Sequence, residues 1–200
     1  MADQLITGTT LVEKESRSIG DIPVGGFVEW DDTFGNLPDG YVLCDGSTIN
    51  DPLSAWNGTA VQNLNTEYSS IHAFQFQGIA PEIDDVNHLA STGRTQIEGT
   101  ITNVAGVNLP NGVIITAVEG YHINAADKNW TLAYAAHNSG TATVMATGLF
   151  GAEDTTITGA TIDNNTNRYW VYTDAMESND YIYSIKFTYT PRNKFIMRTR

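Results

Sequence analysis

Cysteine is nearly absent from this sequence, and long apolar runs are absent altogether. The single cysteine, Cys44, cannot form an internal disulfide, which is the usage expected of a protein made in a reducing compartment. No apolar stretch approaches the roughly 18 residues that a membrane-spanning helix needs, so no membrane insertion is predicted. The amino-terminal residues lack the apolar core of a secretory signal, and we therefore expect no signal peptide.

Basic residues are also scarce. Ten Lys and Arg accompany 23 Asp and Glu, which gives a formal net charge of −13, and residues 186–200 hold five of the bases and no acid. A surface this acidic repels phosphate backbones over most of its area, so nucleic acid is not an expected partner. We interpret the basic carboxy-terminal segment as a closing strand whose bases lie against acids of the same fold, with an acidic partner as the alternative.

Recognisable catalytic and metal-binding motifs are missing. The sequence has no nucleophile elbow, P-loop, metalloprotease motif or paired-cysteine motif, and its four histidines do not show the spacing of metal ligands. Adjacent acids such as Glu153 and Asp154 lack the alternating frame of a calcium loop and are interpreted as solvated turns. We therefore predict a protein that is not an enzyme and has no cofactor or metal site.

The sequence does contain a repeated β pattern, with almost no helical periodicity. From residue 97 onward, segments rich in Val, Ile, Thr, Tyr and Trp recur about every ten residues, separated by turn-forming residues. The expected strands are residues 97–104, 113–123, 130–137, 142–149, 155–162, 168–174 and 181–190. About seven such strands predict an all-β fold in which two antiparallel sheets enclose one core, as a jelly-roll or immunoglobulin-like sandwich.

Alternation predicts which side chains of two strands face the core. Tyr169, Val171 and Thr173 share one face of the strand 168–174. In the strand 181–190, the odd-numbered residues from Tyr181 to Tyr189 form the expected core face.

Three aromatic residues are candidates for a receptor or partner face. Most aromatic side chains of a sandwich fill its core. Trp130, however, begins its strand, and Trp170 and Tyr172 lie on the strand face opposite Tyr169. We expect at least one of the two tryptophans to face solvent or a partner.

Residues 21–65 show a different sequence pattern, in which short apolar stretches alternate with turns rich in Gly, Pro, Asp and Asn. They contain G-F-V-E-W at 26–30, P-D-G-Y-V-L-C-D-G at 38–46, W-N-G-T at 56–59 and N-L-N at 63–65. Pro38-Asp39-Gly40 and Asp45-Gly46 predict two turns around a short strand. Cys44 at the end of this strand is interpreted as a small buried apolar residue.

These motifs resemble the phage tail collar family, in which a G-x-hydrophobic strand is followed by P-x-G-W-x-x-C-[DN]-G. Tyr41 replaces the tryptophan of that pattern, and Gln62 stands where proline is usual. The segment N-K-F-I-M-R at 193–198 is similar to the closing strand of collar-like and tail-fibre tip proteins. The segments 109–116 and 182–190 of the sandwich resemble the start and the end of modules found in marine phage and bacterial surface proteins. The structural motif positions are Pro38, Gly40, Tyr41, Cys44, Asp45 and Gly46.

The resemblance implies a domain order for the whole chain. Residues 21–65 and 191–200 would form one small collar-like unit, closed by the C-terminal strand, into which the sandwich 97–190 is inserted. Residues 1–20 would be an attachment arm and residues 66–96 a connecting loop region. We expect the strand 194–198 to lie beside residues 27–30.

The resemblance also implies a non-enzymatic structural protein of a tailed-phage virion, made in the host cytoplasm and located on the tail or capsid surface. The leading hypothesis is a tail-fibre or collar-type adhesin for host attachment. A head-decoration or head-fibre protein is the alternative, and a carbohydrate-binding module is a further one. We expect a homotrimer that contacts other virion proteins through residues 1–20 and meets a host-surface glycan or protein.

Overall fold

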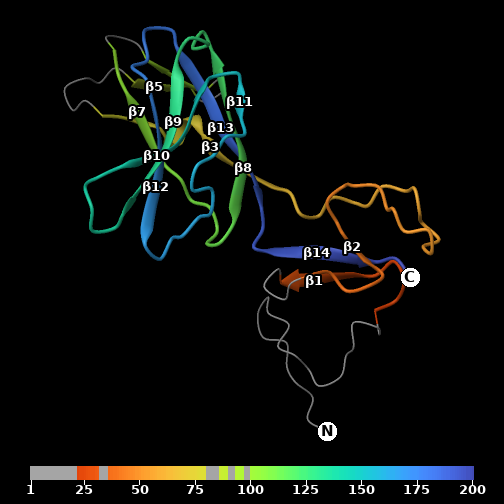
Figure 1. Ribbon diagram of the computed structural model, residues 1–200. Helices are drawn as coiled ribbons and strands as arrows, with labels where there is room; N and C mark the ends of the chain where they lie inside the picture. Colours follow the sequence, from red (N-terminus) through yellow and green to blue (C-terminus); the bar gives the residue numbers. More distant parts are fainter. Residues whose placement is uncertain (1–21, 32–35, 80–85, 90–92, 97–99) are drawn as a thin grey trace. The chain divides into compact units, whose positions relative to one another are not determined.

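The computed structural model describes residues 22–31, 36–79, 86–89, 93–96 and 100–200 (Figure 1). The fold is all-β with antiparallel sheets, as predicted. The chain divides into unit 1, residues 1–65 and 193–200, and unit 2, residues 66–192. Among the described residues, no helix has the length and hydropathy of a membrane span. The predicted arm, residues 1–20, lies outside the described residues.

Unit 1 contains one three-stranded sheet. The strands are β1 (Phe27–Asp31), β2 (Tyr41–Leu43) and β14 (Asn193–Arg198), in the order β1-β14-β2. The register places Phe27 opposite Met197 and Asp31 opposite Asn193, so the predicted pairing of the C-terminal strand with residues 27–30 is confirmed. Because β14 is the central strand, it joins β1 and β2 into one sheet.

The core of unit 1 is small and is built largely from turns. Four buried residues form it, and partly buried residues such as Trp56 and Phe195 pack against them. The four are Cys44, Ile49, Val61 and Met197. One of them comes from β14, so the end of the chain contributes to the core as well as to the sheet.

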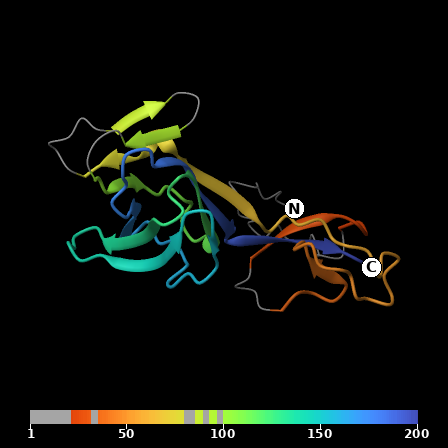
Figure 2. The same cartoon turned by 90° about the horizontal axis from the view of Figure 1, so that it is seen from above.

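Unit 2 consists of two antiparallel sheets. The five-stranded sheet has the order β10 (Thr143–Leu149), β9 (Asn129–Ala136), β12 (Asn167–Thr173), β7 (Asn103–Gly106) and β4 (Gln77–Gly78). The six-stranded sheet has the order β11 (Glu153–Asp154), β8 (Ile114–Ile123), β13 (Tyr181–Thr190), β6 (Gly93–Gln96) and β5 (Val86–Leu89), and β3 (Glu67–His72) also pairs with β13. Figure 2 shows β9 and β10 (green to cyan) on one side of the unit and β3, β5 and β6 (gold to lime) on the other.

One apolar cluster lies between these sheets. It takes Leu132 and Val171 from the five-stranded sheet and Ile185 and Phe187 from the six-stranded sheet, all of them almost fully buried. Unit 2 is therefore sandwich-like, with two layers around one core.

Three expected segments differ from the predictions. In place of the strand expected at 97–104, β7 begins only at Asn103, and Ile101 before it forms an isolated bridge to Met176. Residues 66–96 are not simply a connecting loop, because they contain β3 to β6 and the short 3-10 helix η3 (Ala73–Gln75). Residues 155–162 do not form a strand; β11 ends before them, and only Thr161 forms an isolated bridge, to Ile114. Gly159 has φ +63°, a left-handed conformation that ends an extended run.

The predicted core face of β13 is correct for only part of the strand. Ile185, Phe187 and Tyr189 are buried as expected, but Ile182 is buried in place of its neighbours Tyr181 and Tyr183. The register with β8 shifts between Ile182 and Ser184. Such a bulge inserts one residue and reverses which side chains face the core, so a strictly alternating pattern fails beyond it.

Candidate functional site

The motif at residues 38–46 forms two turns around β2, as predicted. Gly40 has φ +80° and Gly46 has φ +85°, conformations that glycine adopts without steric cost. The Tyr41 amide donates to the Pro38 carbonyl at 3.2 Å, which closes the first turn. The Ser47 amide donates to the Asp45 carboxylate at 2.9 Å, and hydrogen bonds from Ser47 hold the pKa of Asp45 below its usual range.

Cys44 is fully buried and serves as a structural residue. Its amide donates to the Phe195 carbonyl at 2.9 Å, and its carbonyl accepts from the Leu64 amide at 2.7 Å. Burial, with a smaller contribution from the Asp45 carboxylate, raises the pKa of the thiol to about 11. A thiol with so little thiolate at neutral pH is a poor nucleophile. The prediction of a small buried apolar residue is confirmed.

Asn65 holds β14 where β2 ends. Its side-chain oxygen accepts from the Phe195 amide at 2.6 Å, and its side-chain nitrogen donates to the Phe195 carbonyl at 3.0 Å. The Cys44 carbonyl accepts from the Leu64 and Asn65 amides, so the Asn65 side-chain oxygen takes its place as the acceptor for the Phe195 amide. Asn65 is 5% exposed, so these bonds are shielded from water. Sequence reasoning included Asn65 in the N-L-N motif but assigned it no role.

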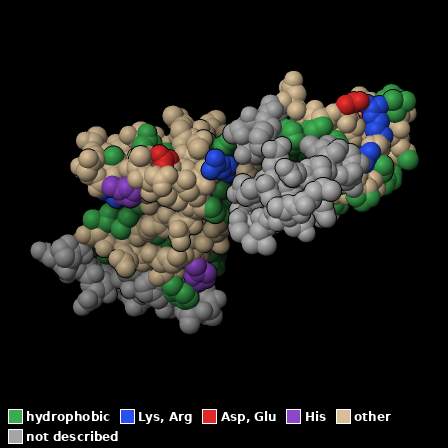
Figure 3. Space-filling model, turned by 90° about the horizontal axis from the view of Figure 1, so that it is seen from below, with side chains coloured by type: hydrophobic (Ala, Val, Ile, Leu, Met, Phe, Trp, Pro, Cys, Tyr) green, Lys and Arg blue, Asp and Glu red, His purple; other side chains and the backbone are tan. Residues whose placement is uncertain are grey.

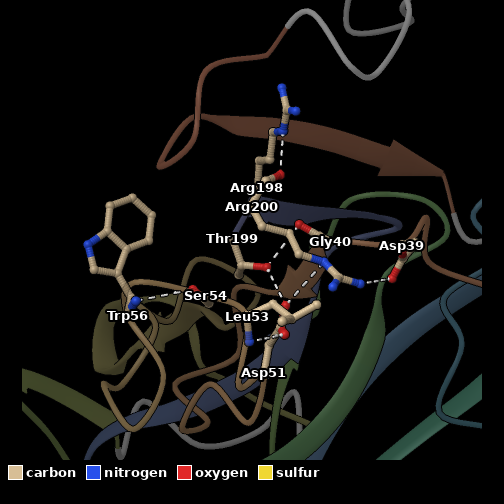
Figure 4. Close-up of polar contacts among 9 residues, drawn as sticks. All are labelled: Asp39, Gly40, Asp51, Leu53, Ser54, Trp56, Arg198, Thr199 and Arg200. Atoms are coloured by element: carbon tan, nitrogen blue, oxygen red, sulfur yellow. Dashed lines mark hydrogen bonds and ion pairs between the residues drawn. The ribbon is translucent and has the colours of Figure 1, made fainter.

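The residues after β14 are held by a C-terminal clasp, which we define as Asp39, Gly40, Asp51, Thr199 and Arg200 (Figure 4). The Thr199 amide and hydroxyl donate to the Gly40 carbonyl at 2.8 and 3.0 Å. Arg200 forms an ion pair with Asp39 and lies 3.5 Å from the Asp51 carboxylate. The expected contact of C-terminal bases with acids of the same fold is confirmed.

The charged groups of the clasp hold the end of the chain in place by ion pairs and hydrogen bonds. The Asp51 carboxylate accepts hydrogen bonds from the Thr199 hydroxyl at 3.3 Å and from the Leu53 amide at 3.0 Å, so it joins the chain end to the turn that follows it. The Asp39 side chain is 90% exposed, and an exposed ion pair of this kind contributes only about 0 to 1 kcal/mol. Backbone and buried hydrogen bonds therefore carry most of the stabilisation of the clasp.

Trp130, predicted to be a candidate receptor residue, is instead fully buried in unit 2. It lies between two glycines, Gly120 of β8 and Gly148 of β10. A Cβ atom added to Gly148 would come within 2.5 Å of the Trp130 ring, and one added to Gly120 would come within 2.8 Å. The missing side chains leave room for the indole in the core. The prediction is wrong because the first residue of a strand need not lie at the surface.

Trp170 and Tyr172 lie on the outward face of β12 and are half-buried. Tyr169, Val171 and Thr173 on the other face are buried, so the predicted alternation is confirmed. The outward face is covered by no further sheet among the described strands. Part of each outward ring is therefore accessible.

The surroundings of Trp170 differ on its two sides. On β9 its cross-strand neighbour is Ala133, which is fully buried. On β7 the neighbour is Gly106, and a Cβ atom built there meets nothing within 4 Å. The outer face of the sheet is thus open beside Trp170 on the β7 side only.

A hollow of about 220 Å³ borders Gly106. It is lined by residues 69–71 of β3, by Gln75, by the segment 106–109 and by Phe187. Its polar lining residues are Ser69, Ser70, Gln75 and Asn108, and none of its lining residues is charged. Sequence reasoning missed this hollow because residues 66–96 were expected to be a loop.

A second polar cluster lies on the outward face of the six-stranded sheet. The Lys186 ammonium is 2.7 Å from the Glu119 carboxylate and 3.0 Å from the Tyr121 hydroxyl, which itself donates to Glu119 at 2.5 Å. Hydrogen bonds from Lys186 and Tyr121 lower the pKa of Glu119, and the same contacts raise the pKa of Lys186. Each of the three groups forms hydrogen bonds with the other two, so the cluster links β8 to β13.

Charged side chains are sparse on the face of unit 2 shown in Figure 3. Within the described part of the chain, no group of three or more His, Cys, Asp and Glu side chains is arranged to hold a metal ion. Comparisons with protein-family models, curated proteins and solved structures found no match to this chain.

Proposed function

We propose that this protein is a non-enzymatic structural protein of a tailed-phage virion, a tail-fibre or collar-type adhesin for host attachment. One observation carries the proposal: motif residues chosen from the sequence alone act together on the C-terminal strand. Cys44 and Asn65 bind the backbone of Phe195, and Gly40 binds Thr199. The motif residues thus hold the C-terminal strand in unit 1, which supports the resemblance to collar-like proteins.

The division of the chain into units fits the same role. Unit 1 is assembled from both ends of the sequence, and unit 2 is formed by the residues between them. An adhesin needs one part that joins the particle and another that is displayed. In the proposal, unit 1 and residues 1–20 contact other virion proteins, and unit 2 carries the receptor surface.

The proposed oligomer is a homotrimer. Among the described strands, β1 and β2 are the edges of the unit 1 sheet, and association is a common way of covering short edge strands. Light scattering of the purified protein is expected to give three times the chain mass of 21.8 kDa. A mass equal to that of one chain would contradict the trimer.

The location is tested by immunogold electron microscopy of phage particles from a host lysate. Antibodies against purified unit 2 epitopes are expected to label the tail. Labelling of the head would support head decoration instead. If the particles are not labelled and mass spectrometry finds no peptide of this chain in them, the virion proposal is wrong.

A further inference from the structure

We propose that the outer edge of β3 and the hollow beside it receive residues 4–12 of a second copy of this chain, as one added strand. The inference rests on the proposed homotrimer and names a contact that would join its copies. If each copy passes this segment to the next, three copies close into a ring. We call the outer edge of β3 and the hollow together the β3 edge site.

The first support is the regularity of β3 as an edge strand. It pairs with β13 over all six of its residues without a register shift, and none of the described strands pairs with its other edge. The edge strand β10 is interrupted by a bulge between Val144 and Ala146, and β4, β5 and β11 have only two to four residues. Bulges, short length, lysine and proline protect edges from association, and β3 has none of them. Its edge is therefore open to a further strand.

The backbone of β3 offers hydrogen bonds along this edge. The His72 amide donates to the Gln75 side-chain oxygen at 2.7 Å, so it points away from β13. Because the direction of the amides alternates along a strand, those of Ser70 and Tyr68 point to the same side. No backbone of the described segments, other than that of β13, pairs with β3. An added strand can therefore bond to these groups.

The hollow lies along the same edge. Gln75, which accepts the outward-pointing His72 amide, lines the hollow together with residues 69–71. From the other sheet, the segment 106–109 lines it. There β4 pairs only with residues 103 and 104 of β7, so no described strand covers the following residues of β7 on that side. Both sheets thus lack a strand beside the hollow.

The lining of the hollow suits side chains from an added strand. Three lining residues belong to the core and are at most 4% exposed, namely Ile71, Leu109 and Phe187. The remaining ones are neutral. The volume is about 220 Å³, and an apolar cavity of roughly 150 Å³ is enough to hold benzene. Every second side chain of a strand added to β3 points between the sheets, so one or two aliphatic or threonine side chains would fill the hollow.

Residues 4–12, which lie outside the described residues, have a sequence that suits this site, Q-L-I-T-G-T-T-L-V. They carry no charge, which matches a hollow without a charged lining residue. Five of the nine are Ile, Val or Thr, which favour strands. In a strand, one face would present aliphatic and threonine side chains to the hollow, those of Leu5, Thr7, Thr9 and Leu11.

Other segments of the chain are less suitable, because the fold already uses them. The other uncharged runs of nine or more residues are 52–66, 68–81, 99–118 and 129–152. The first contains Val61 of the unit 1 core, and each of the others contains described strands. Residues 4–12 are therefore the uncharged run that a second copy can supply.

The test links two copies through engineered cysteines. Chains with Ser70→Cys, an exposed position on β3, are co-expressed with chains that carry one cysteine in the added strand, and the purified protein is oxidised. The native Cys44 is fully buried and does not compete. Because each chain carries one new cysteine, a mixed disulfide forms only between copies. The four positions to be tried face outward when Leu11 faces the hollow: Ile6→Cys, Gly8→Cys, Thr10→Cys and Val12→Cys.

At least one of these pairs is expected to give a linked species of twice the chain mass on a non-reducing gel. Val144→Cys is the matched control for Ser70→Cys, because it is 48% exposed on the bulged edge strand β10, and it should give at least tenfold less product. Equal yields with both would overturn the inference. So would a disulfide that forms only within a chain carrying both cysteines, or capture of Ser70→Cys in particles by a different virion protein.

A second pair of variants tests the hollow itself. Leu11→Asp places a charge in the hollow and is expected to reduce the mass in light scattering to that of one chain. Val12→Asp is the matched control, because the neighbouring side chain faces outward, and it should leave the mass unchanged. A trimer that persists in Leu11→Asp contradicts this inference and leaves the proposed trimer intact. Linked copies of a protein that is absent from virions would contradict only the proposed function.

Discussion

Replacement of Asn65 by alanine tests how unit 1 is held together. The variant removes the two hydrogen bonds, of 2.6 and 3.0 Å, that join the carboxamide to the backbone of Phe195. The Phe195 carbonyl keeps its bond from the Cys44 amide, but the Phe195 amide loses its acceptor. The cost is therefore two hydrogen bonds and one amide without a protein partner.

The magnitude follows from these losses. Each hydrogen bond contributes about 1 kcal/mol, and an unsatisfied buried amide costs about 1 to 3 kcal/mol more. The two lost bonds alone account for about 2 kcal/mol, which we take as the lower limit of the cost. We expect unit 1 to lose about 2 kcal/mol of its free energy of unfolding, which lowers hydrogen-exchange protection roughly 30-fold.

The assay is native-state hydrogen exchange of the full chain, resolved by strand. Protection of the β14 amides should fall, while β9 and β12 of unit 2 should keep theirs. Asn57→Ala is the matched control, because Asn57 is exposed and its side chain forms no hydrogen bond within the described residues. Unchanged β14 protection in Asn65→Ala, or an equal loss in both units, would refute the reasoning.

Three further predictions concern other parts of the structure. Gly148→Ala should overpack Trp130 and destabilise unit 2 by about 1 to 3 kcal/mol in thermal or chemical unfolding. Lys186→Met should raise the pKa of Glu119, measured by NMR titration of its carboxyl carbon. In the unsubstituted protein the pKa of Glu119 is lower in the folded than in the unfolded state. The stabilisation from Glu119 is therefore present above the unfolded pKa and is lost as the pH falls through the folded pKa. The Cys44 thiol should react with a thiol reagent at pH 8 only when unit 1 unfolds, because burial raises its pKa to about 11.

Each of these predictions has a control. Gly140→Ala adds a methyl group in open space and should leave stability unchanged; an equal loss would mean that glycine flexibility, not packing, sets the effect. Lys128→Met removes a contact of 3.0 Å with Glu177 and should leave the titration of Glu119 unaltered. Rapid labelling of Cys44 under conditions that keep the unit 1 amides protected would contradict its burial.

Local sequence patterns were sufficient for several features of this protein. Turn residues with fixed conformational preferences predicted the turns at Gly40 and Gly46, and alternation predicted the buried face of β12. The closing strand was predicted beside residues 27–30 because both segments resembled one family. In each case the information lies in residue type and short spacing, which act through local backbone preferences and the two-residue period of a strand.

Other features depended on contacts between distant residues. The strands in residues 66–96 carry little local signal, and β3 exists through its pairing with β13, more than a hundred residues away. Burial of Trp130 depends on Gly120 and Gly148, which lie on strands of different sheets. Neither glycine marks a turn, so no local pattern connects them with the tryptophan.

The surroundings of Trp170 show the same division. Sequence alternation placed Trp170 on the outward face of its strand, because side-chain direction follows a local period. Only the tertiary structure put Gly106 of β7 and Ala133 of β9 opposite it. Such positions depend on the register of long-range strand pairs, and register is decided by the burial of the whole sheet rather than by any one segment.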